Sequence, residues 1–158
     1  MPILVYSNPP FEVIATGFAL QLSVIDLQEM RIPNRILLPG IGLTAFSILL
    51  IGLMTSELIR ALFALAGGAI SVLIFFFLHL LRPSGLGMGD VKFAGLIGLT
   101  LSWISFPVGL IGLALAFIAS SIFSIIIFVV KRNNFQRVIP FAPFMFLGLL
   151  FVEFGLIL

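Results

Sequence analysis

Long apolar stretches, separated by short breaks that contain polar, Pro or Gly residues, make up nearly the whole chain. Each stretch is continuous enough to form a helix in a bilayer, whose ~30 Å core needs about 20 apolar residues per crossing. The pattern predicts an all-α polytopic membrane protein with six transmembrane helices in a single membrane-embedded domain, residues 1–158. The predicted helices cover about 13–30, 36–54, 58–81, 90–103, 107–130 and 143 to the last residue.

Pro and Gly residues set the details of these helices. Pro33 disfavours helix at the residue before it, and Asn34 suits a turn, so the first connection falls at 31–35. Pro39 is expected in the first turn of the second helix, where proline is tolerated. Gly67-Gly68 predicts a close helix contact in the third helix. The fourth helix is short for a bilayer, which implies local thinning or a partly wet surrounding.

The composition excludes several classes of protein and site. Hydrophobic residues make up 61% of the 158 residues and charged residues only 9%, whereas a soluble domain carries about 25% charged residues. The absence of Cys excludes a thiol nucleophile and a Cys-based zinc site. The one His, His79, is interpreted as a helix-end residue, and no cofactor is expected. A net charge of +2 does not indicate a nucleic-acid partner.

The basic residues predict how the chain is oriented. Six crossings place the segments 31–35, 82–92 and 131–137 on one side of the membrane, and basic loops stay in the cytoplasm. Both termini should then face outward, and Asp26 and Asp90 should lie near the cytoplasmic face. These segments hold Arg31, Arg35, Arg82, Lys92, Lys131, Arg132 and Arg137, against Arg60 alone on the other side.

Two aspartates are the candidate chemical groups. Asp90 follows three glycines in Gly85-Leu86-Gly87-Met88-Gly89, and Asp26 ends the first apolar stretch. An aspartate there is costly unless it is paired or used, and glycines let a backbone come close. Two carboxyl groups in a poorly solvated site share one proton and titrate as a unit. Such a pair can deprotonate water and protonate a peptide carbonyl oxygen, as in aspartic proteases.

Other readings of the aspartates remain open on the residues alone. Each could cap a helix or pair with a loop arginine in headgroup water. A proton-coupled transporter or channel could use paired intramembrane aspartates. A membrane scaffold would need no chemistry from either aspartate. Lys92 could tune the pair or contact headgroup phosphates. Glu153, inside the last stretch, is expected to reach the outer surface.

Three motifs resemble one family. Gly87-Met88-Gly89-Asp90 matches the GxGD signature of intramembrane aspartyl proteases, and with Val91-Lys92 it is similar to the second-aspartate motif of the type IV prepilin peptidases. Ile25-Asp26 with Ile32-Pro33-Asn34 resembles that family's first-aspartate motif. The run Ile139–Phe144 resembles its late proline-rich motif, with Ala142 where the family usually has glycine.

The resemblance implies a GxGD-type aspartic endopeptidase of the prokaryotic inner membrane, with its active site facing the cytoplasm. Its substrates would be prepilin-like or pseudopilin-like proteins, cut between a short basic leader and an apolar helix. Longer members carry an N-methyltransferase region with paired CxxC motifs, so this chain resembles the short, peptidase-only members. Asp26 and Asp90 would be catalytic, with supporting roles for Pro33, Asn34, Gly87, Gly89, Lys92, Pro140 and Pro143.

Overall fold

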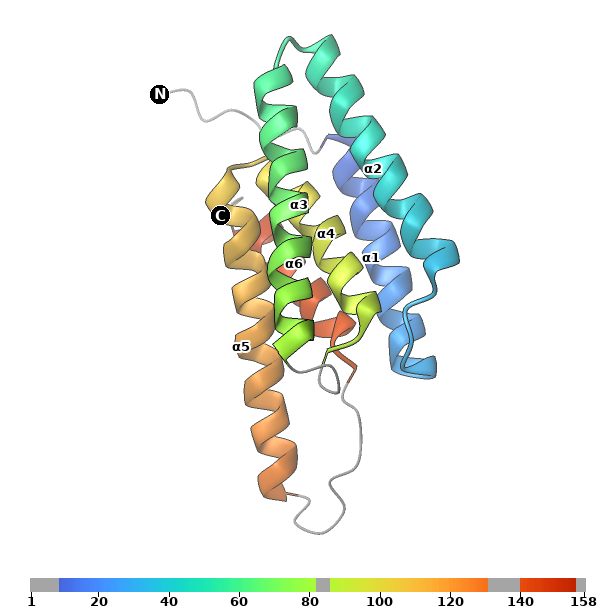
Figure 1. Ribbon diagram of the computed structural model, residues 1–158, viewed down its shortest axis with the longest axis vertical. Coiled ribbons are helices and arrows are strands. Elements are labelled where there is room, and N and C mark those ends of the chain that lie inside the picture. The colour runs from blue at the N-terminus through green and yellow to red at the C-terminus, as the bar shows by residue number, and fades with distance from the viewer. Residues whose placement is uncertain (1–8, 82–85, 131–139, 156–158) are drawn as a thin grey trace.

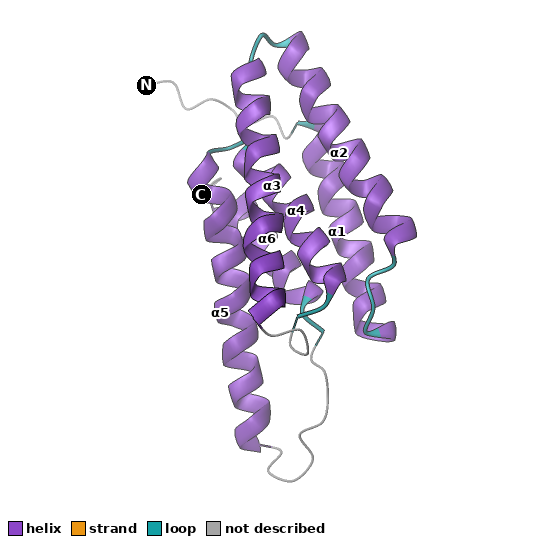
Figure 2. Ribbon diagram, viewed as in Figure 1, coloured by secondary structure: helices purple, strands orange, loops and turns teal. Residues whose placement is uncertain are grey.

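The computed structural model describes residues 9–81, 86–130 and 140–155, and the described residues form helices joined by short loops (Figures 1 and 2). The predicted all-α class is confirmed. The helices are α1 (Pro10–Glu29), α2 (Asn34–Met54), α3 (Leu58–Leu81), α4 (Met88–Ser102), α5 (Phe106–Val130) and α6 (Ala142–Gly155).

Four of these helices are long and apolar enough to cross a membrane. They are α1, α2, α3 and the segment Phe106–Phe123 of α5. Helix α4 has 15 residues and α6 has 14 within the described part of the chain. The structure therefore supports a multi-pass membrane protein, and the full count of six crossings stays a prediction.

Helix starts differ from the predicted ones by up to three residues. Helix α2 begins at Asn34 because the Pro33 carbonyl accepts hydrogen bonds from the amides of Ile36 and Leu37, both at 3.1 Å. Pro39 consequently lies inside α2 and not in its first turn. Helix α4 begins at Met88, so Asp90 lies within its first turn.

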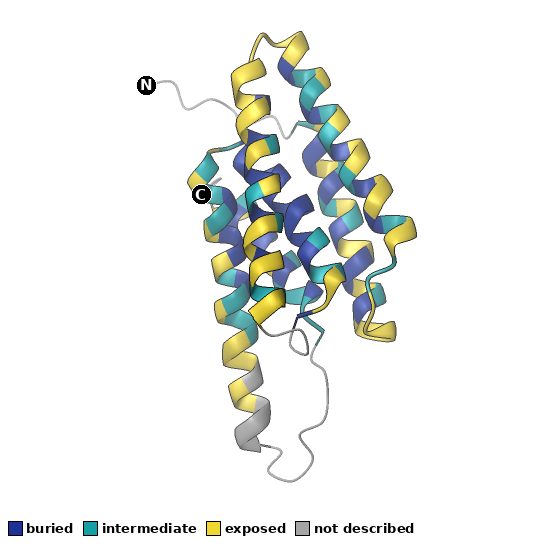
Figure 3. Ribbon diagram, viewed as in Figure 1, coloured by how far each residue is buried: buried dark blue, intermediate teal, exposed yellow. Residues whose placement is uncertain are grey.

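Helix α4 is the centre of the bundle. It contacts each of the other five helices, and every residue from Phe93 to Ser102 is buried (Figure 3). Gly95 and Gly98 let the neighbouring helix α3 approach α4 closely, which permits such an enclosed position. Its five neighbours enclose this short helix, and the expected local thinning or partly wet entrance stays a prediction.

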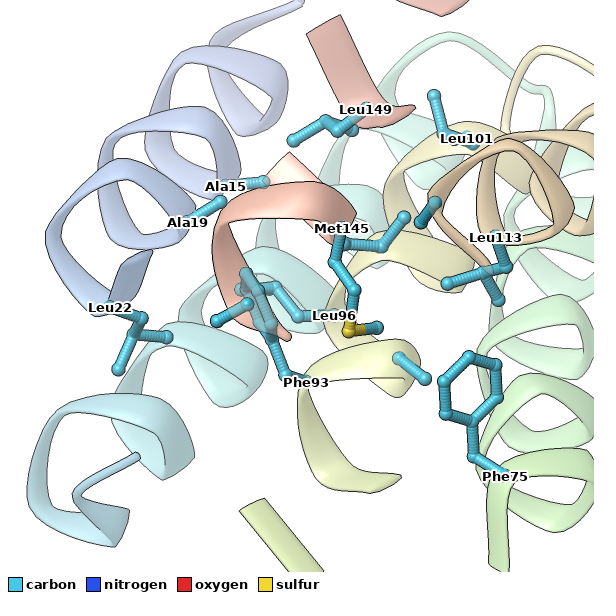
Figure 4. Close-up of a cluster of buried hydrophobic side chains, with 14 of the residues drawn as sticks. Ala15, Ala19, Leu22, Phe75, Phe93, Leu96, Leu101, Leu113, Met145 and Leu149 are labelled. Atoms are coloured by element: carbon cyan, nitrogen blue, oxygen red, sulfur yellow. The ribbon is translucent and has the colours of Figure 1, made fainter. Parts of the chain in front are cut away.

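Large apolar side chains from five helices form the core around α4 (Figure 4). Met145 of α6 lies beside Phe93 and Leu96 of α4, and Leu149 of α6 and Leu22 of α1 belong to the same cluster. The predicted close contact at Gly67-Gly68 is confirmed. A Cβ atom at Gly68 would lie 2.5 Å from Leu99 Cγ, so α3 and α4 approach through the missing side chains.

The ends of the bundle differ in charge. The end of α1 and the start of α4 lie at the same end of the molecule (Figure 1), with Arg31, Arg35 and Lys92 in the segments there. The opposite end carries Arg60 near the start of α3. The other basic residues predicted for the first end, Arg82, Lys131, Arg132 and Arg137, lie outside the described residues.

Candidate active site

The last turn of α1 holds Asp26, whose side chain is only 5% exposed. The helix ends because Met30 adopts a left-handed conformation with φ 52°, and its amide donates to the Asp26 carbonyl oxygen at 2.9 Å. The chain then reverses through the extended Pro33 into α2. Asp26 is therefore fixed at a helix end beside a tight connection, as the sequence predicts.

The first turn of α6 contacts Asp26 directly. The Ala142 amide donates a hydrogen bond to Asp26 Oδ2 at 3.2 Å. One turn earlier in α1, the Ser23 hydroxyl lies 2.7 Å from the Ala19 carbonyl oxygen and 3.2 Å from the Ala142 carbonyl oxygen. The amide at a helix start favours a negative group. A backbone amide serves equally from Ala or Gly, so Ala142 keeps this contact despite departing from the family's usual glycine.

Asp90 lies in the first turn of α4 and is half-buried. The Gly87 amide, just before the helix, donates to Asp90 Oδ2 at 3.0 Å. A Cβ atom on Gly87 would lie 3.2 Å from that oxygen. Gly87 therefore lets its backbone approach the carboxyl group, and this contact orients Asp90 at the start of the helix.

Two further contacts join the segment of Asp90 to the connection between α1 and α2. A Cβ atom on Gly89 would lie 2.8 Å from Ile32 Cβ, so the two chain segments touch there. Lys92 Nζ donates to Asn34 Oδ1 at 3.0 Å. Neither of the two roles considered for Lys92, tuning the aspartates or contacting headgroup phosphates, includes this partner.

These contacts bring Asp26 and Asp90 to one end of the bundle. The Gly89–Ile32 approach and the Lys92–Asn34 hydrogen bond join the segment of Asp90 to the connection that follows Asp26. Pro33 and Asn34 lie at the start of α2, and Pro140 and Pro143 flank the start of α6. Within the described part of the chain, no group of three or more Asp, Glu, His or Cys side chains offers a metal site. The arrangement thus gathers the two candidate aspartates and the motif segments around them at one end of the bundle.

His79 is a residue of this end that sequence reasoning interpreted only as a helix-end residue. Its Nδ1 lies 2.6 Å from the Leu86 carbonyl oxygen, seven residues further along the chain. Leu86 is buried, directly before Gly87. The contact ties the last turn of α3 to the segment that leads into Asp90. Its only signal in the sequence is a lone histidine close to the glycines.

Comparison with models of protein families gives one match. The model described as the type IV leader peptidase family matches residues 13–130, about three quarters of the chain. The chain belongs to the type IV leader peptidase family. Comparison with curated proteins and with solved structures finds no match.

The match to the type IV leader peptidase family includes both aspartates and their supporting residues up to Lys92. It ends before the segment with Pro140 and Pro143. In the structure of this family member, the hydrogen bond from Ala142 places that later segment against Asp26. The third motif is therefore part of the same site by contact, independently of the family match.

Acidic residues also meet at the opposite end of this family member. Glu153 is half-buried, and the Thr16 hydroxyl lies 3.2 and 3.3 Å from its two carboxylate oxygens. Glu12, in the first turn of α1, is buried. The side chain of Glu153 joins α6 to α1, and the expectation that Glu153 reaches the outer surface stays a prediction.

Proposed function

We propose that this protein is a membrane aspartic endopeptidase that removes the leader peptide from type IV prepilin-like proteins. The observation that carries the proposal is the pair of Asp26 and Asp90, which come from separate helices of a leader peptidase family member and lie at the same end of the bundle. Residues 1–158 act as a single peptidase domain. A scaffold would not require two carboxyl groups at one end of the bundle, and the family match favours a peptidase over a transporter.

The proposed chemistry follows from two adjacent carboxyl groups that share one proton. The ionised aspartate takes a proton from a bound water, whose oxygen attacks the peptide carbonyl carbon. The protonated aspartate gives its proton to the carbonyl oxygen. The tetrahedral intermediate then collapses as the peptide C–N bond breaks: the leaving amine takes the proton that the first aspartate received from water, and a hydroxyl proton of the intermediate returns to the second aspartate. Backbone amides of Ala142 and Gly87 keep the two carboxyl groups in position.

The substrate and its partners follow from the family. We propose prepilin-like or pseudopilin-like substrates, with a short basic leader followed by an apolar helix. The apolar helix could lie in the bilayer while the leader enters from the aqueous side. The protein itself requires membrane lipid, and neither a cofactor nor nucleic acid enters the proposed reaction.

The proposed function is tested by co-expressing the protein with a candidate prepilin and measuring the prepilin mass. We expect a product shortened by its leader, which is absent when the peptidase is omitted. Intact prepilin in the presence of folded, membrane-inserted protein would contradict the proposed function for that substrate class.

We propose that the aspartates face the cytoplasm of a prokaryotic cell and that the enzyme lies in its inner membrane. Arg31, Arg35 and Lys92 support this orientation, because basic segments are retained in the cytoplasm. A topology reporter fused after Arg137 should then report the cytoplasmic side, and one fused at Leu158 the external side. An external result after Arg137 would reverse the proposed orientation.

The hydrogen bond between Lys92 and Asn34 predicts a moderate effect on cleavage. Removing either partner loosens the contact between the starts of α4 and α2, and one such bond contributes roughly 0.5–1.5 kcal/mol. We expect Lys92→Ala and Asn34→Ala each to lower the cleavage rate by roughly three- to tenfold. The double variant should be little worse than either single one.

The matched control for this pair is Arg35→Ala, an exposed neighbour of Asn34. Its cleavage rate should stay near that of the unaltered protein. If Lys92 acted only on headgroup phosphates, Asn34→Ala would leave the rate unchanged and the effects of the two substitutions would add. Cleavage measured in membranes at matched expression decides between these results.

A further inference from the structure

A pocket of about 510 Å³ lies at the end of the bundle opposite the aspartates. It is formed by the start of α3, the end of α4 and the start of α5, and its lining includes Glu57, Arg60, Phe63, Trp103 and Phe106. Asp90 and Trp103 mark the two ends of α4, about 20 Å apart at 1.5 Å per residue. The pocket is therefore separate from the proposed catalytic pair.

Its polar part carries two opposite charges side by side. Arg60 Nη1 lies 2.9 Å from Glu57 Oε2, and both side chains are about half exposed. The Arg60 guanidinium carbon lies 5.6 Å from the centroid of the Trp103 ring, a cation–π distance. Trp103 is buried and packs edge-on against Phe11 at 5.2 Å between ring centroids. The guanidinium is thus held between a carboxylate and a fixed indole.

The rest of the pocket is apolar and opens toward the outside of the bundle. Ile59 and Phe63 are among its lining residues, with 72% and 56% of their surface exposed. Side chains of this kind at a helix end of a membrane protein face the acyl chains, and Trp is typical of the level of the headgroups. The pocket volume falls in the ~300–1,000 Å³ range of sites for small molecules.

We propose that this pocket binds phosphatidylethanolamine from the adjacent leaflet. Its phosphate would accept hydrogen bonds from Arg60, whose planar fork of donors suits phosphate oxygens. Its primary ammonium would donate to the Glu57 carboxylate, and an acyl chain would lie along Ile59 and Phe63. Phosphatidylcholine has no N–H to donate, and phosphatidylglycerol has no positive charge for Glu57. The charge pair of the pocket thus matches the charge pair of one headgroup.

The site is tested by native mass spectrometry of the purified full chain with equal amounts of phosphatidylethanolamine, phosphatidylcholine and phosphatidylglycerol. We expect phosphatidylethanolamine to bind roughly tenfold more tightly than either competitor. Arg60→Gln should lower its affinity by roughly tenfold. Glu57→Gln should leave binding of the phosphate but abolish the preference over phosphatidylglycerol. The control Arg31→Gln removes an exposed positive charge at the other end and should change neither result.

Three results would overturn the proposal. In the first, all three lipids bind with equal affinity and Arg60→Gln does not change that affinity. Another is a preference for phosphatidylglycerol, which would indicate a purely anionic lipid contact. The third is a dimer that excludes lipid, which would assign the pocket to a second copy of the chain. Glu57→Gln changes a half-exposed residue and keeps its shape, so it preserves the test even if Arg60→Gln unfolds the protein.

Discussion

Asp26→Asn and Asp90→Asn should each abolish leader cleavage, with rates lowered by roughly 10²- to 10⁴-fold or more. Asparagine keeps the shape of aspartate and an acceptor oxygen for the Ala142 or Gly87 amide. It can neither take the proton from water nor pass one to the peptide. The variants should therefore insert and fold normally while the acid–base cycle stops.

Non-additivity is the sharper part of this prediction. Two groups that act as a unit lose their function together, so the double variant should be no worse than either single one. Glu29→Gln is the matched control, because Glu29 is an exposed carboxylate one turn after Asp26. Glu29→Gln should lower the cleavage rate far less than either Asn substitution. Cleavage of a prepilin in membranes at matched expression gives all four rates.

Near-normal cleavage by either single Asn variant would remove that aspartate from the mechanism. The effect of the Asn variants on proton-coupled flux would then distinguish the two remaining interpretations, a transporter and a scaffold. A transporter would lose proton-coupled flux when an aspartate is neutralised, whereas a scaffold would tolerate Asn at both positions.

Gly148→Ala should destabilise the bundle by roughly 1–3 kcal/mol, the usual cost of overpacking a close contact. A Cβ atom at Gly148 would lie 2.5 Å from the Gly112 carbonyl oxygen of α5 and 3.3 Å from Ala116 Cβ. Because the first of these is a backbone atom, the two helices must separate. Helix α6 also supplies the Ala142 amide to Asp26, so the cleavage rate should fall together with the thermal unfolding temperature.

The control for Gly148→Ala is Gly42→Ala in α2. A Cβ atom at Gly42 would meet nothing within 4 Å. Alanine is favoured over glycine inside a helix by up to about 1 kcal/mol, so this variant should unfold at the same or a higher temperature. Thermal unfolding of the purified proteins in detergent, followed by circular dichroism, compares the two. Equal unfolding temperatures would show that α5 and α6 are not packed as closely as the structure has them.

The single sequence predicts the helices well because apolar length and Pro or Gly breaks are local properties of the chain. Helix α3 has the predicted bounds, 58–81, and the other helices start within a few residues of prediction. The first residue of each helix is predicted less accurately, because it depends on single hydrogen bonds such as those that the Pro33 carbonyl accepts. The order of the motifs and the separation of basic residues can also be read directly from the chain.

The surroundings of α4 could not be read from the sequence in the same way. A short apolar stretch is compatible with a thinned bilayer or with complete enclosure by other helices, and hydrophobicity is the same in both cases. The structure decides for enclosure, because α4 contacts all five neighbours. The glycines of α3 and α4 permit this approach, but which helices use them depends on packing of the whole bundle.

The candidate site shows the same division. Sequence alone identified Asp26 and Asp90 as costly carboxylates at helix ends, and the alternation of crossings predicted a shared face. Only the tertiary structure decided their partners: the Ala142 amide for Asp26, Asn34 for Lys92, and the Leu86 carbonyl for His79. Most of these contacts join residues far apart in the chain. They depend on how each helix is rotated and placed against its neighbours, which the local pattern of apolar and polar residues does not specify.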